Sequence, residues 1–422
     1  MGKKEGVTLK KVRVGVLGIG RGRSMIEYAK IAGNAELVAV CDFYEEGLEK
    51  LKNELNNTNI SYYTRFDDFL NHRMDVVVLA NYATEHAPFA IKALKKGLHV
   101  FSEVLPVQTL AEAVALVETI EETKLVYAYG ENYCYMPAVR EMKKRYQMGH
   151  LGTFEYGEGE YIHNCEPIWA DITYGDPAHW RNHMYATFYC THSIGPLLNI
   201  TGLRPVSVVG FELPYGSRAE RMGKLGGMAG IEMITLENGA VIKSIHGDLG
   251  KNSIWFSIYG SKGRMESARE DTLLSDVERI YVDTDTEEGI FDGHVETYLP
   301  KEALHEQAKH FGHGGSDFYT MYHFIEKVLG HEADTIDIYQ ALDMFLPGLY
   351  AYRSILNENK VQQIPNFRIK AERDQVKSDH ACTDPLVAKE SLLPCYSKGN
   401  PQISDSTYLK LKDAYQRKKS EK

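Results

Sequence analysis

Short apolar strands alternate with amphipathic helices from residue 12 to residue 129, and this alternation constrains the fold more than any other feature. The strand segments VRVGVL, LVAVC and VVVLA are apolar throughout, as expected for strands that are covered on both faces. Helices that connect such strands form right-handed crossovers and keep the strands parallel. The pattern therefore predicts an α/β protein that begins with a doubly wound parallel sheet of the Rossmann type. The predicted strands are Val12–Leu17, Leu37–Cys41, Val76–Ala80, His99–Phe101 and Leu125–Tyr129, and the predicted helices are Met25–Ala32, Glu45–Leu55, Ala87–Lys96 and Thr109–Thr123.

The pattern changes after residue 135, where apolar and polar residues alternate with a period of two. Such alternation is typical of antiparallel strands with one exposed face, and the turn at Glu237–Gly239 connects two of them. We predict an α+β domain with a largely antiparallel open sheet. Its predicted strands are Thr153–Tyr161, Val206–Leu213, Gly230–Leu236, Ala240–His246 and Ser253–Tyr259, and its helices are Pro137–Gln147, Asp317–Leu329 and Ile336–Leu356.

The length of 422 residues suggests two domains or slightly more, since a domain usually has roughly 100–200 residues. We predict a Rossmann domain, a fold typical of dinucleotide binding, at 1–134 and an α+β domain for substrate binding and oligomerisation at 135–370. Residues 371–422 are polar and weakly periodic, which predicts an arm or a loosely ordered tail. The arm would embrace a neighbouring subunit, whereas the tail would lie free.

Composition excludes several classes of partner and compartment. The net charge of −10 and the scarcity of long basic blocks disfavour nucleic acid, which needs a concentrated basic face. No segment approaches the roughly 20 apolar residues of a membrane span, and the first residues lack the apolar stretch of a signal peptide. The six cysteines form no C-x-x-C pair, so we expect neither a disulfide framework nor a zinc ribbon. These features predict a cytoplasmic protein that binds a small molecule.

A glycine-rich turn follows the first strand and reads GIGRGR from Gly18 to Arg23. Glycines at such a turn let backbone N–H groups approach a pyrophosphate at the start of the next helix. The motif is imperfect because Arg23 occupies the position of the third glycine. The residues of this loop that we predict to contact the cofactor are Gly18, Gly20, Arg21, Gly22 and Arg23.

Asp42 strengthens the prediction of a dinucleotide site. It ends the second strand, 24 positions after Gly18, where a carboxylate would accept hydrogen bonds from the adenosine ribose. The same carboxylate would repel a 2′-phosphate, so NAD is the predicted cofactor rather than NADP. The alternative is a structural glycine turn with an aspartate that caps the end of the strand.

Four further motifs lie in this part of the chain, namely Asn81–His86 (NYATEH), Gly97–Val100 (GLHV), Ser102–Glu103 and Glu131–Pro137 (ENYCYMP). Together with the glycine loop and Asp42 they resemble the Gfo/Idh/MocA family of sugar-linked NAD(P) oxidoreductases. The resemblance implies that Asn81, His86, Glu103 and Asn132 also help to hold the cofactor.

Val104 departs from that family. The family usually has Glu-Lys-Pro at this point, and its lysine exchanges a proton with the substrate hydroxyl. This chain reads Glu103-Val104-Leu105-Pro106, and valine cannot transfer a proton. Either the usual dehydrogenase chemistry is lost, or another residue has taken over the role of the lysine.

The second half of the chain favours replacement of the lysine by another group. Its motifs are EYIH at 160–163, HWR at 179–181, FYCTHSIGP at 188–196 and GHGGSDF at 312–318. They look like the NAD-dependent glycoside hydrolase branch of the family, which includes α-N-acetylgalactosaminidases and also has Glu-Val in place of Glu-Lys. Cys190 and Ser193 differ from the signature of that branch.

The resemblance implies a redox-neutral cleavage of a hexoside. Oxidation at C3 gives a ketone that acidifies the C2 proton, a base removes this proton, and the substituent at C1 is eliminated. Water then adds, and the retained NADH reduces the ketone. The sequence leaves two other functions open, a net sugar dehydrogenase or keto-reductase and an NAD-binding regulator without activity.

Tyr189 and His192 match the signature of that branch and are the predicted acid/base pair. They lie three positions apart, so on one helical turn they would face the same pocket. Tyr161 is the next catalytic candidate, as acid or base for the leaving group. The predicted substrate-binding residues are Arg181, Trp180, His163, Tyr135 and His313.

Each of these residues also has a structural alternative. Histidine at a helix start and tyrosine in a strand are often core residues, and Arg181 beside Trp180 could simply pack against the indole. The histidines between residues 163 and 192 are candidates for a metal site, but they lack the usual acidic partner, and no metal is predicted. We also expect a homo-oligomer, because the exposed sheet of this family commonly packs against a second copy.

Overall fold

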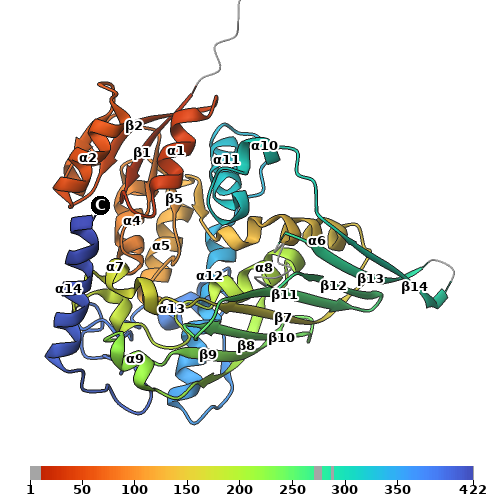
Figure 1. Cartoon of the computed structure of the whole chain (residues 1–422). Helices are drawn as coiled ribbons and strands as arrows, with labels where there is room; N and C mark the ends of the chain where they lie inside the picture. Colours follow the sequence, from red (N-terminus) through yellow and green to blue (C-terminus); the bar gives the residue numbers. More distant parts are fainter. Residues whose placement is uncertain (1–10, 270–277, 287–288, 422) are drawn as a thin grey trace, which may run out of the picture. The chain divides into compact units, whose positions relative to one another are not determined.

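The computed structural model describes residues 11–269, 278–286 and 289–421, which divide into two compact units (Figure 1). Unit 1 consists of Met1–Val107, Ala115–Asn132 and Leu304–Ile338. Unit 2 consists of Gln108–Val114, Tyr133–Ala303 and Tyr339–Lys422.

Unit 1 is built on a parallel sheet of six strands in the order β3-β2-β1-β4-β5-β6. The central strands β1 and β4 carry fully buried valines on both faces of the sheet, which explains why their sequences are almost continuously apolar. The predicted doubly wound sheet is therefore confirmed, and β3 is a strand that the sequence pattern missed. The strands are β1 (Val12–Leu17), β2 (Ala35–Cys41), β3 (Ser61–Tyr63), β4 (Val76–Leu79), β5 (His99–Ser102) and β6 (Tyr127–Tyr129).

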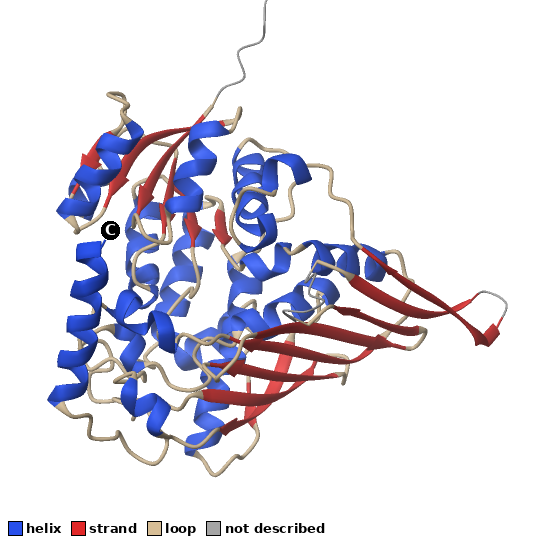
Figure 2. Ribbon diagram, viewed as in Figure 1, coloured by secondary structure: helices blue, strands red, loops and turns tan. Residues whose placement is uncertain are grey.

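Helices cover both faces of this sheet (Figure 2). One of them, α11, comes from far along the sequence and packs against α1 through Phe318, whose ring lies 5.3 Å from that of Tyr28. The α11 residue Phe324 likewise contacts Phe101 of β5 at 5.6 Å. The helices of unit 1 are α1 (Arg23–Ile31), α2 (Glu45–Leu55), α3 (Phe66–Phe69), η1 (Ala83–Glu85), α4 (His86–Lys95), α10 (His305–Ala308), η5 (His313–Gly315) and α11 (Ser316–Val328), and α5 (Leu110–Thr123) begins in the segment of unit 2.

These contacts give the units different limits from the predicted domains. The prediction assigned 304–338 to the domain 135–370, whereas the structure groups this segment with the Rossmann sheet. Residues 371–422, predicted as a separate arm or tail, are grouped with unit 2. The reason is that the aromatic face of α11 is buried against α1 and β5, a long-range contact that local periodicity does not reveal.

Unit 2 contains a sheet of nine strands in the order β14-β13-β12-β11-β7-β10-β9-β8-β15. Its neighbouring strands are antiparallel except for β7 and β10, which are parallel. The predicted largely antiparallel open sheet is confirmed. The strands are β7 (Phe154–Ile162), β8 (Pro205–Glu212), β9 (Ala229–Leu236), β10 (Val241–Gly247), β11 (Ser253–Gly260), β12 (Gly263–Ser267), β13 (Ile280–Thr286), β14 (Gly289–Tyr298) and β15 (Gln362–Gln363).

Helices α6 and α8 pack on one face of this sheet. The other face presents apolar side chains to solvent, among them Phe211 and Tyr259. The helices of unit 2 are η2 (Asn132–Tyr135, which starts at the last residue of unit 1), α6 (Pro137–Gln147), η3 (Glu166–Ile168), α7 (Trp169–Thr173), η4 (Trp180–His183), α8 (Thr191–Thr201), α9 (Ser217–Arg221), α12 (Ile338–Leu356), α13 (Lys370–Val376) and α14 (Asp405–Glu421).

The C-terminal segment ends in α14, which packs on α7 (Figure 1). Tyr408 donates a hydrogen bond of 2.9 Å from its hydroxyl to the carbonyl of Gly223, and Leu411 packs against a buried cluster around Trp169. These contacts are the reason that the segment is grouped with the rest of unit 2.

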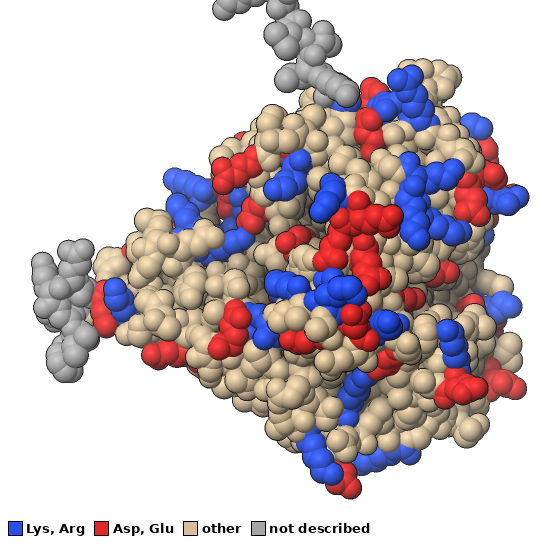
Figure 3. Space-filling model, turned by 180° about the vertical axis from the view of Figure 1, so that it is seen from behind, with Lys and Arg blue, Asp and Glu red and all other residues tan. Residues whose placement is uncertain are grey.

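Charged side chains of both signs are interspersed on the face shown in Figure 3. Exposed ion pairs include that of Lys92 with Asp67 at 3.1 Å. In the described part of the chain, none of the helices combines the length and the apolar character needed to cross a bilayer.

Candidate functional site

The glycine loop between β1 and α1 leaves an open space at its apex. A Cβ atom on Gly18 would lie 2.3 Å from the carbonyl oxygen of Ala80, and one on Gly22 would lie 2.1 Å from the carbonyl oxygen of Gly18. Gly18 also has a φ of +93°, which favours glycine. A Cβ on Gly20 would meet nothing within 4 Å. The loop is thus tightly packed at its base and open at Gly20.

The N-terminus of α1 follows this open apex directly. Gly22 is its N-cap and has no side chain that could accept a hydrogen bond from the first turn. An uncapped helix start carries partial positive charge and free N–H groups, which suits a pyrophosphate. The predicted placement of the cofactor's phosphates at Gly18–Gly22 fits this geometry.

Asp42 is fixed beside the same loop. One carboxylate oxygen accepts a hydrogen bond of 2.8 Å from the N–H of Ile19, and the other accepts one of 2.9 Å from the N–H of Tyr44. Each oxygen keeps a further lone pair for a donor such as a ribose hydroxyl. The residues present therefore fit NAD at this site.

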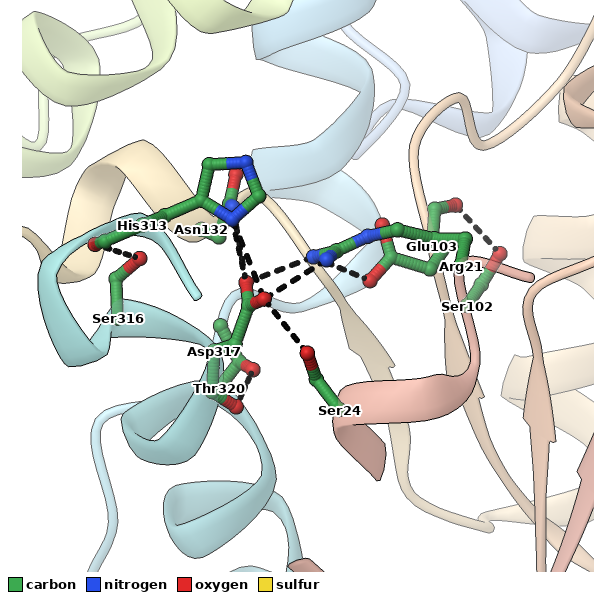
Figure 4. A network of polar contacts seen from close by, with 9 residues as sticks. All are labelled: Arg21, Ser24, Ser102, Glu103, Asn132, His313, Ser316, Asp317 and Thr320. Carbon is green, nitrogen blue, oxygen red and sulfur yellow. Dashed lines mark hydrogen bonds and ion pairs between the residues drawn. The ribbon is translucent and has the colours of Figure 1, made fainter. Parts of the chain in front are cut away.

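A network of buried charges lies next to the loop and joins three segments of unit 1 (Figure 4). The Arg21 guanidinium donates two hydrogen bonds of 2.8 Å to the carboxylate of Asp317 on α11, and it contacts Glu103 at 3.0 Å. Asn132 donates to Asp317 at 3.0 Å, and His313 does so at 3.2 Å. The bidentate pair fixes Arg21, so this side chain is already engaged by the protein.

Burial and charge shift the two carboxyl groups of this network in opposite directions. Burial raises the pKa of Glu103, against the opposing effect of Arg21. Burial alone would also raise the pKa of Asp317, but hydrogen bonds from Arg21 and His313 hold this pKa well below its usual value. Asp317 is therefore ionised at neutral pH, and it anchors the loop through Arg21.

The other predicted cofactor residues lie in different surroundings. Arg23 forms ion pairs with Glu27 and Glu54 at the surface. His86 is fully buried and donates a hydrogen bond of 2.7 Å from Nδ1 to the carbonyl of Leu105, and burial lowers its pKa to about 4. This bond supports the segment after Glu103, which includes the buried Val104.

Asn81 directly follows Ala80, whose carbonyl approaches Gly18. Its side-chain N–H donates to Glu85 at 3.3 Å, while its Oδ1 is enclosed and has no hydrogen-bond partner in the described structure. An unpaired buried acceptor of this kind is available to a ligand.

A cluster of aromatic side chains surrounds His192 in unit 2. His192 lies in the first turn of α8 and is 6% exposed. Its ring centroid lies 4.6 Å from that of Tyr133, 4.7 Å from Tyr161 and 5.1 Å from Tyr189. Tyr161 and Tyr133 also contact each other at 5.2 Å. The structure thus brings the three predicted catalytic residues together and adds Tyr133.

Tyr161 connects this cluster to His163. A hydrogen bond of 3.2 Å joins the Tyr161 hydroxyl to Nδ1 of His163, two residues along the chain. Burial raises the pKa of Tyr161 well above its ordinary value, and the neighbouring Tyr133 and Tyr189 add to this effect. The phenol therefore remains protonated at neutral pH.

Arg181 and Trp180 lie on η4. The guanidinium of Arg181 stacks over the Trp180 ring, 4.4 Å from its centroid. The imidazole of His179 also stacks on the Trp180 ring, with the two ring centroids 5.8 Å apart. Burial lowers the pKa of His179 to about 3, and Arg181 adds to the shift. His179 is therefore neutral, and its Nδ1 accepts a hydrogen bond from the N–H of Arg181.

Two predicted substrate residues differ from the rest in their placement. His313 belongs to unit 1 and is bound to Asp317, whereas the other predicted substrate residues belong to unit 2. Tyr135 is 3% exposed. The residues that the sequence reasoning missed are Tyr133 and Asp317, although both stand inside motifs that it quoted, ENYCYMP and GHGGSDF.

A metal centre has no visible basis in the described residues, where no group of three or more His, Cys, Asp or Glu side chains is arranged to hold an ion. The histidines between 163 and 192 make aromatic contacts and hydrogen bonds instead.

Two separate parts of the chain match known protein families. Residues 12–131 match the oxidoreductase family with an NAD-binding Rossmann fold, known as Gfo/Idh/MocA, and residues 224–372 match the C-terminal domain of glycosyl hydrolase 109.

Individual relatives give the same result. A glycosyl hydrolase family 109 protein of Phocaeicola vulgatus is 26% identical over 404 residues, covering 85% of this chain and 84% of its own. One from Solibacter usitatus is 25% identical, covering 84% and 88%. Among solved structures, an oxidoreductase domain protein from Kribbella flavida superimposes with a TM-score of 0.69 at 18% identity, covering 84% of this chain and all of that one.

Proposed function

Because this chain joins the NAD-binding Rossmann domain of the Gfo/Idh/MocA oxidoreductase family to the C-terminal domain of glycosyl hydrolase 109, we propose that it cleaves a glycoside by transient oxidation of the sugar. Both matches agree with an NAD-dependent, sugar-processing enzyme. The proposal adds the reaction, which is hydrolysis of a hexoside with no net redox change.

The groups that would hold NAD are the open loop at Gly20, the start of α1 and the carboxylate of Asp42. When bound, NAD supplies reversible hydride exchange with a sugar carbon, which makes the neighbouring C–H acidic while the carbonyl lasts. Arg21, held by Asp317 and Glu103, fixes the shape of the loop.

His192 is the proposed base for the C2 proton. Histidine can take up and return a proton near neutral pH, which a reaction that runs in two directions requires. Tyr189 and Tyr133 pack on the imidazole ring and restrict its orientation. Val104 has no proton to exchange, so the acid/base work falls to the tyrosine and histidine side chains of unit 2.

Tyr161 is the proposed acid for the leaving group at C1. Its raised pKa keeps the proton on the phenol, so it donates rather than accepts. His163, hydrogen-bonded to the Tyr161 hydroxyl, fixes the direction of that hydroxyl. Arg181 and Trp180 would then bind the sugar through a cationic and an aromatic surface. The observation that carries the proposal is the cluster of three tyrosines around His192.

The test is release of the phenol from a panel of aryl hexosides without added cofactor, with solvent deuterium followed at C2. We expect release together with exchange at C2, and loss of both in the variant His192→Ala. His150→Ala, at an exposed histidine of the same unit, is the matched control and should keep full activity. Stoichiometric NADH without release would instead identify a net dehydrogenase, and unchanged turnover in His192→Ala would contradict the proposed base.

A further inference from the structure

Helix α14 contacts the rest of unit 2 through one of its faces. The residues that make these contacts are spaced by three or four positions, as on one side of a helix. They are Tyr408, Leu411, Tyr415 and Lys418. Lys418 donates a hydrogen bond of 2.8 Å from its ammonium to the carboxylate of Asp171 on α7. Both family matches end before α14, so they assign no role to this helix.

The turn that follows α7 approaches this face of α14 closely. Gly175 in this turn has a φ of +63°, and a Cβ atom on it would lie 2.3 Å from the backbone nitrogen of Lys412. A residue without a side chain is therefore required at this point of the turn. The preceding residue, Tyr174, contacts Tyr415 with the two ring centroids 5.4 Å apart. The turn thus packs on α14 through both its backbone and a side chain.

The same turn leads to the residues that are proposed to bind the sugar. The ring centroid of Tyr174 lies 5.8 Å from that of His179, in an edge-on arrangement. His179 stacks on Trp180, and its Nδ1 accepts a hydrogen bond of 3.3 Å from the N–H of Arg181. A continuous series of contacts therefore connects Tyr415 on α14 to Trp180 and Arg181.

Arg181 in turn acts on the proposed catalytic cluster. Burial raises the pKa of Tyr161, and the positive charge of Arg181 opposes this effect. The two side chains are therefore close enough to interact electrostatically. The position of Arg181 matters both for the sugar and for the proposed acid.

The other end of this segment is supported from the core of unit 2. The buried Asn182 accepts a hydrogen bond of 3.1 Å from the indole of Trp169 and donates one of 2.9 Å to the carbonyl of Asp176. Tyr174, in contrast, is an exposed residue that contacts α14. Loss of the contact with α14 should therefore loosen residues 174–181 and leave the support by Trp169 in place.

We propose that α14 positions the sugar-binding segment 174–181 and that Tyr415 is the positioning residue. This inference rests on the proposed function, because it assigns a support to the residues that would bind the sugar. When Trp180 and Arg181 are held in place beforehand, the sugar does not have to order them on binding. Apparent affinity falls in proportion to the fraction of molecules in which they are ordered. A loosened α14 should therefore weaken binding without changing the chemical step.

The first test measures KM and kcat of full-length variants with the p-nitrophenyl hexoside that the wild type cleaves fastest. Tyr415→Ala should raise KM at least fivefold and change kcat less than twofold, as expected for a loss of binding alone. Tyr415→Phe keeps the ring that contacts Tyr174 and should have the wild-type KM. Gln416→Ala, at an exposed position of the same helix, is the matched control and should leave both constants unchanged.

Amide hydrogen exchange gives a second test that does not depend on turnover. In Tyr415→Ala the amides of residues 174–181 should exchange at least tenfold faster than in the wild type, while those of β7 should not change. In the wild type, low concentrations of urea should open residues 174–181 and 405–421 together. This measurement needs no variant, so it decides the matter even if Tyr415→Ala does not fold. Residues 174–181 that stay protected after α14 opens, or an unchanged KM in folded Tyr415→Ala, would overturn the proposal.

Failure of this proposal differs from failure of the proposed function. Faster amide exchange at residues 174–181 in Tyr415→Ala, with no release from any hexoside and no deuterium at C2, would refute the proposed function and leave α14 as the support of this segment. Release by the wild type, with the same KM and the same amide exchange in Tyr415→Ala, would refute the role of α14 and leave the proposed function.

Discussion

Val104 is a buried apolar side chain that has no proton to exchange. Its surroundings are supported by His86, whose bond to Leu105 holds the segment in place. In the proposed reaction the proton-transfer groups are Tyr161 and His192, whose ring centroids lie 4.7 Å apart. The raised pKa of Tyr161 supports the role of acid that is proposed for it.

Substitution of Tyr161 by phenylalanine tests this role. We expect kcat to fall by about 10²-fold for alkyl glycosides, because the leaving alkoxide is no longer protonated. The loss should be smaller for p-nitrophenyl glycosides, whose phenolate leaves without an acid. The difference in kcat between wild type and Tyr161→Phe should persist to about pH 9, because Tyr161 of the wild type remains protonated there. This pH lies below the ordinary tyrosine pKa of about 10.

Tyr156→Phe is the matched control, because Tyr156 lies on the same strand and its hydroxyl donates a hydrogen bond of 3.0 Å to Glu158. It should leave kcat unchanged. An equal loss for good and poor leaving groups in Tyr161→Phe would contradict the assignment of an acid.

Asp317 gives a prediction about stability and its dependence on pH. Its carboxylate is 1% exposed and holds Arg21, so Asp317→Asn should lower the free energy of unfolding by about 3 kcal/mol at neutral pH. The pKa of Asp317 is lowered in the folded state, so this stabilisation is complete above the unfolded pKa of about 3.9 and declines as the pH falls below it. Urea unfolding of both proteins between pH 7 and pH 3 measures the difference.

The control for this variant is Asp67→Asn. Asp67 pairs with Lys92 at 3.1 Å, but both side chains are more than half exposed, so the change should stay within about 1 kcal/mol. A gap between wild type and Asp317→Asn that widens on acidification would have the wrong sign for a lowered pKa.

Among the elements, those with clear periodicity were predicted closely and those defined by distant contacts were not. The strand β1 and the helices α2 and α6 have the predicted limits, because their apolar patterns match the geometry of each element. The hairpin β13–β14 and the helix α14 were missed. Helix α14 contains no fully buried residue, so its sequence lacks an apolar stripe that would indicate it.

The candidate site follows the same division. Gly18, Asp42, Tyr161 and His192 were predicted from motifs with a direct chemical meaning. The role of Asp317 as the partner of Arg21 could not be predicted, because 296 positions separate them in the sequence and no local pattern connects an arginine to a distant carboxylate.

Two leucines of α14 test whether this helix belongs to the folded structure. Leu411 packs against the buried cluster around Trp169, whereas Leu409 is 60% exposed. Leu411→Ala should cost about 1–2 kcal/mol of unfolding free energy, since part of a leucine side chain leaves an apolar contact. Leu409→Ala should change it by less than about 0.5 kcal/mol. Chemical denaturation measures both, and equal, negligible effects would indicate a tail that lies free.

At the scale of the whole molecule, the chain forms unit 1 from three separate stretches of sequence. The last of them, Leu304–Ile338, contributes Phe318 and Phe324 to the packing against α1 and β5, and Asp317 to the glycine loop. A boundary drawn after residue 134 therefore removes aromatic contacts from the core of unit 1 and leaves Arg21 with Glu103 as its carboxylate partner. The predicted homo-oligomer stays a prediction.

Two fragments test this composition of unit 1. Residues 1–134 alone should be poorly soluble or lack a cooperative thermal transition, because Tyr28 and Phe101 lose their partners on α11. The same fragment joined through a flexible glycine–serine linker to residues 304–338 should unfold cooperatively and bind NAD, measured by calorimetry. A version of this fusion with Asp317→Asn should bind NAD more weakly, since the glycine loop loses its anchor. If residues 1–134 alone melt cooperatively and bind NAD as tightly as the fusion, the helix α11 is dispensable for the dinucleotide site.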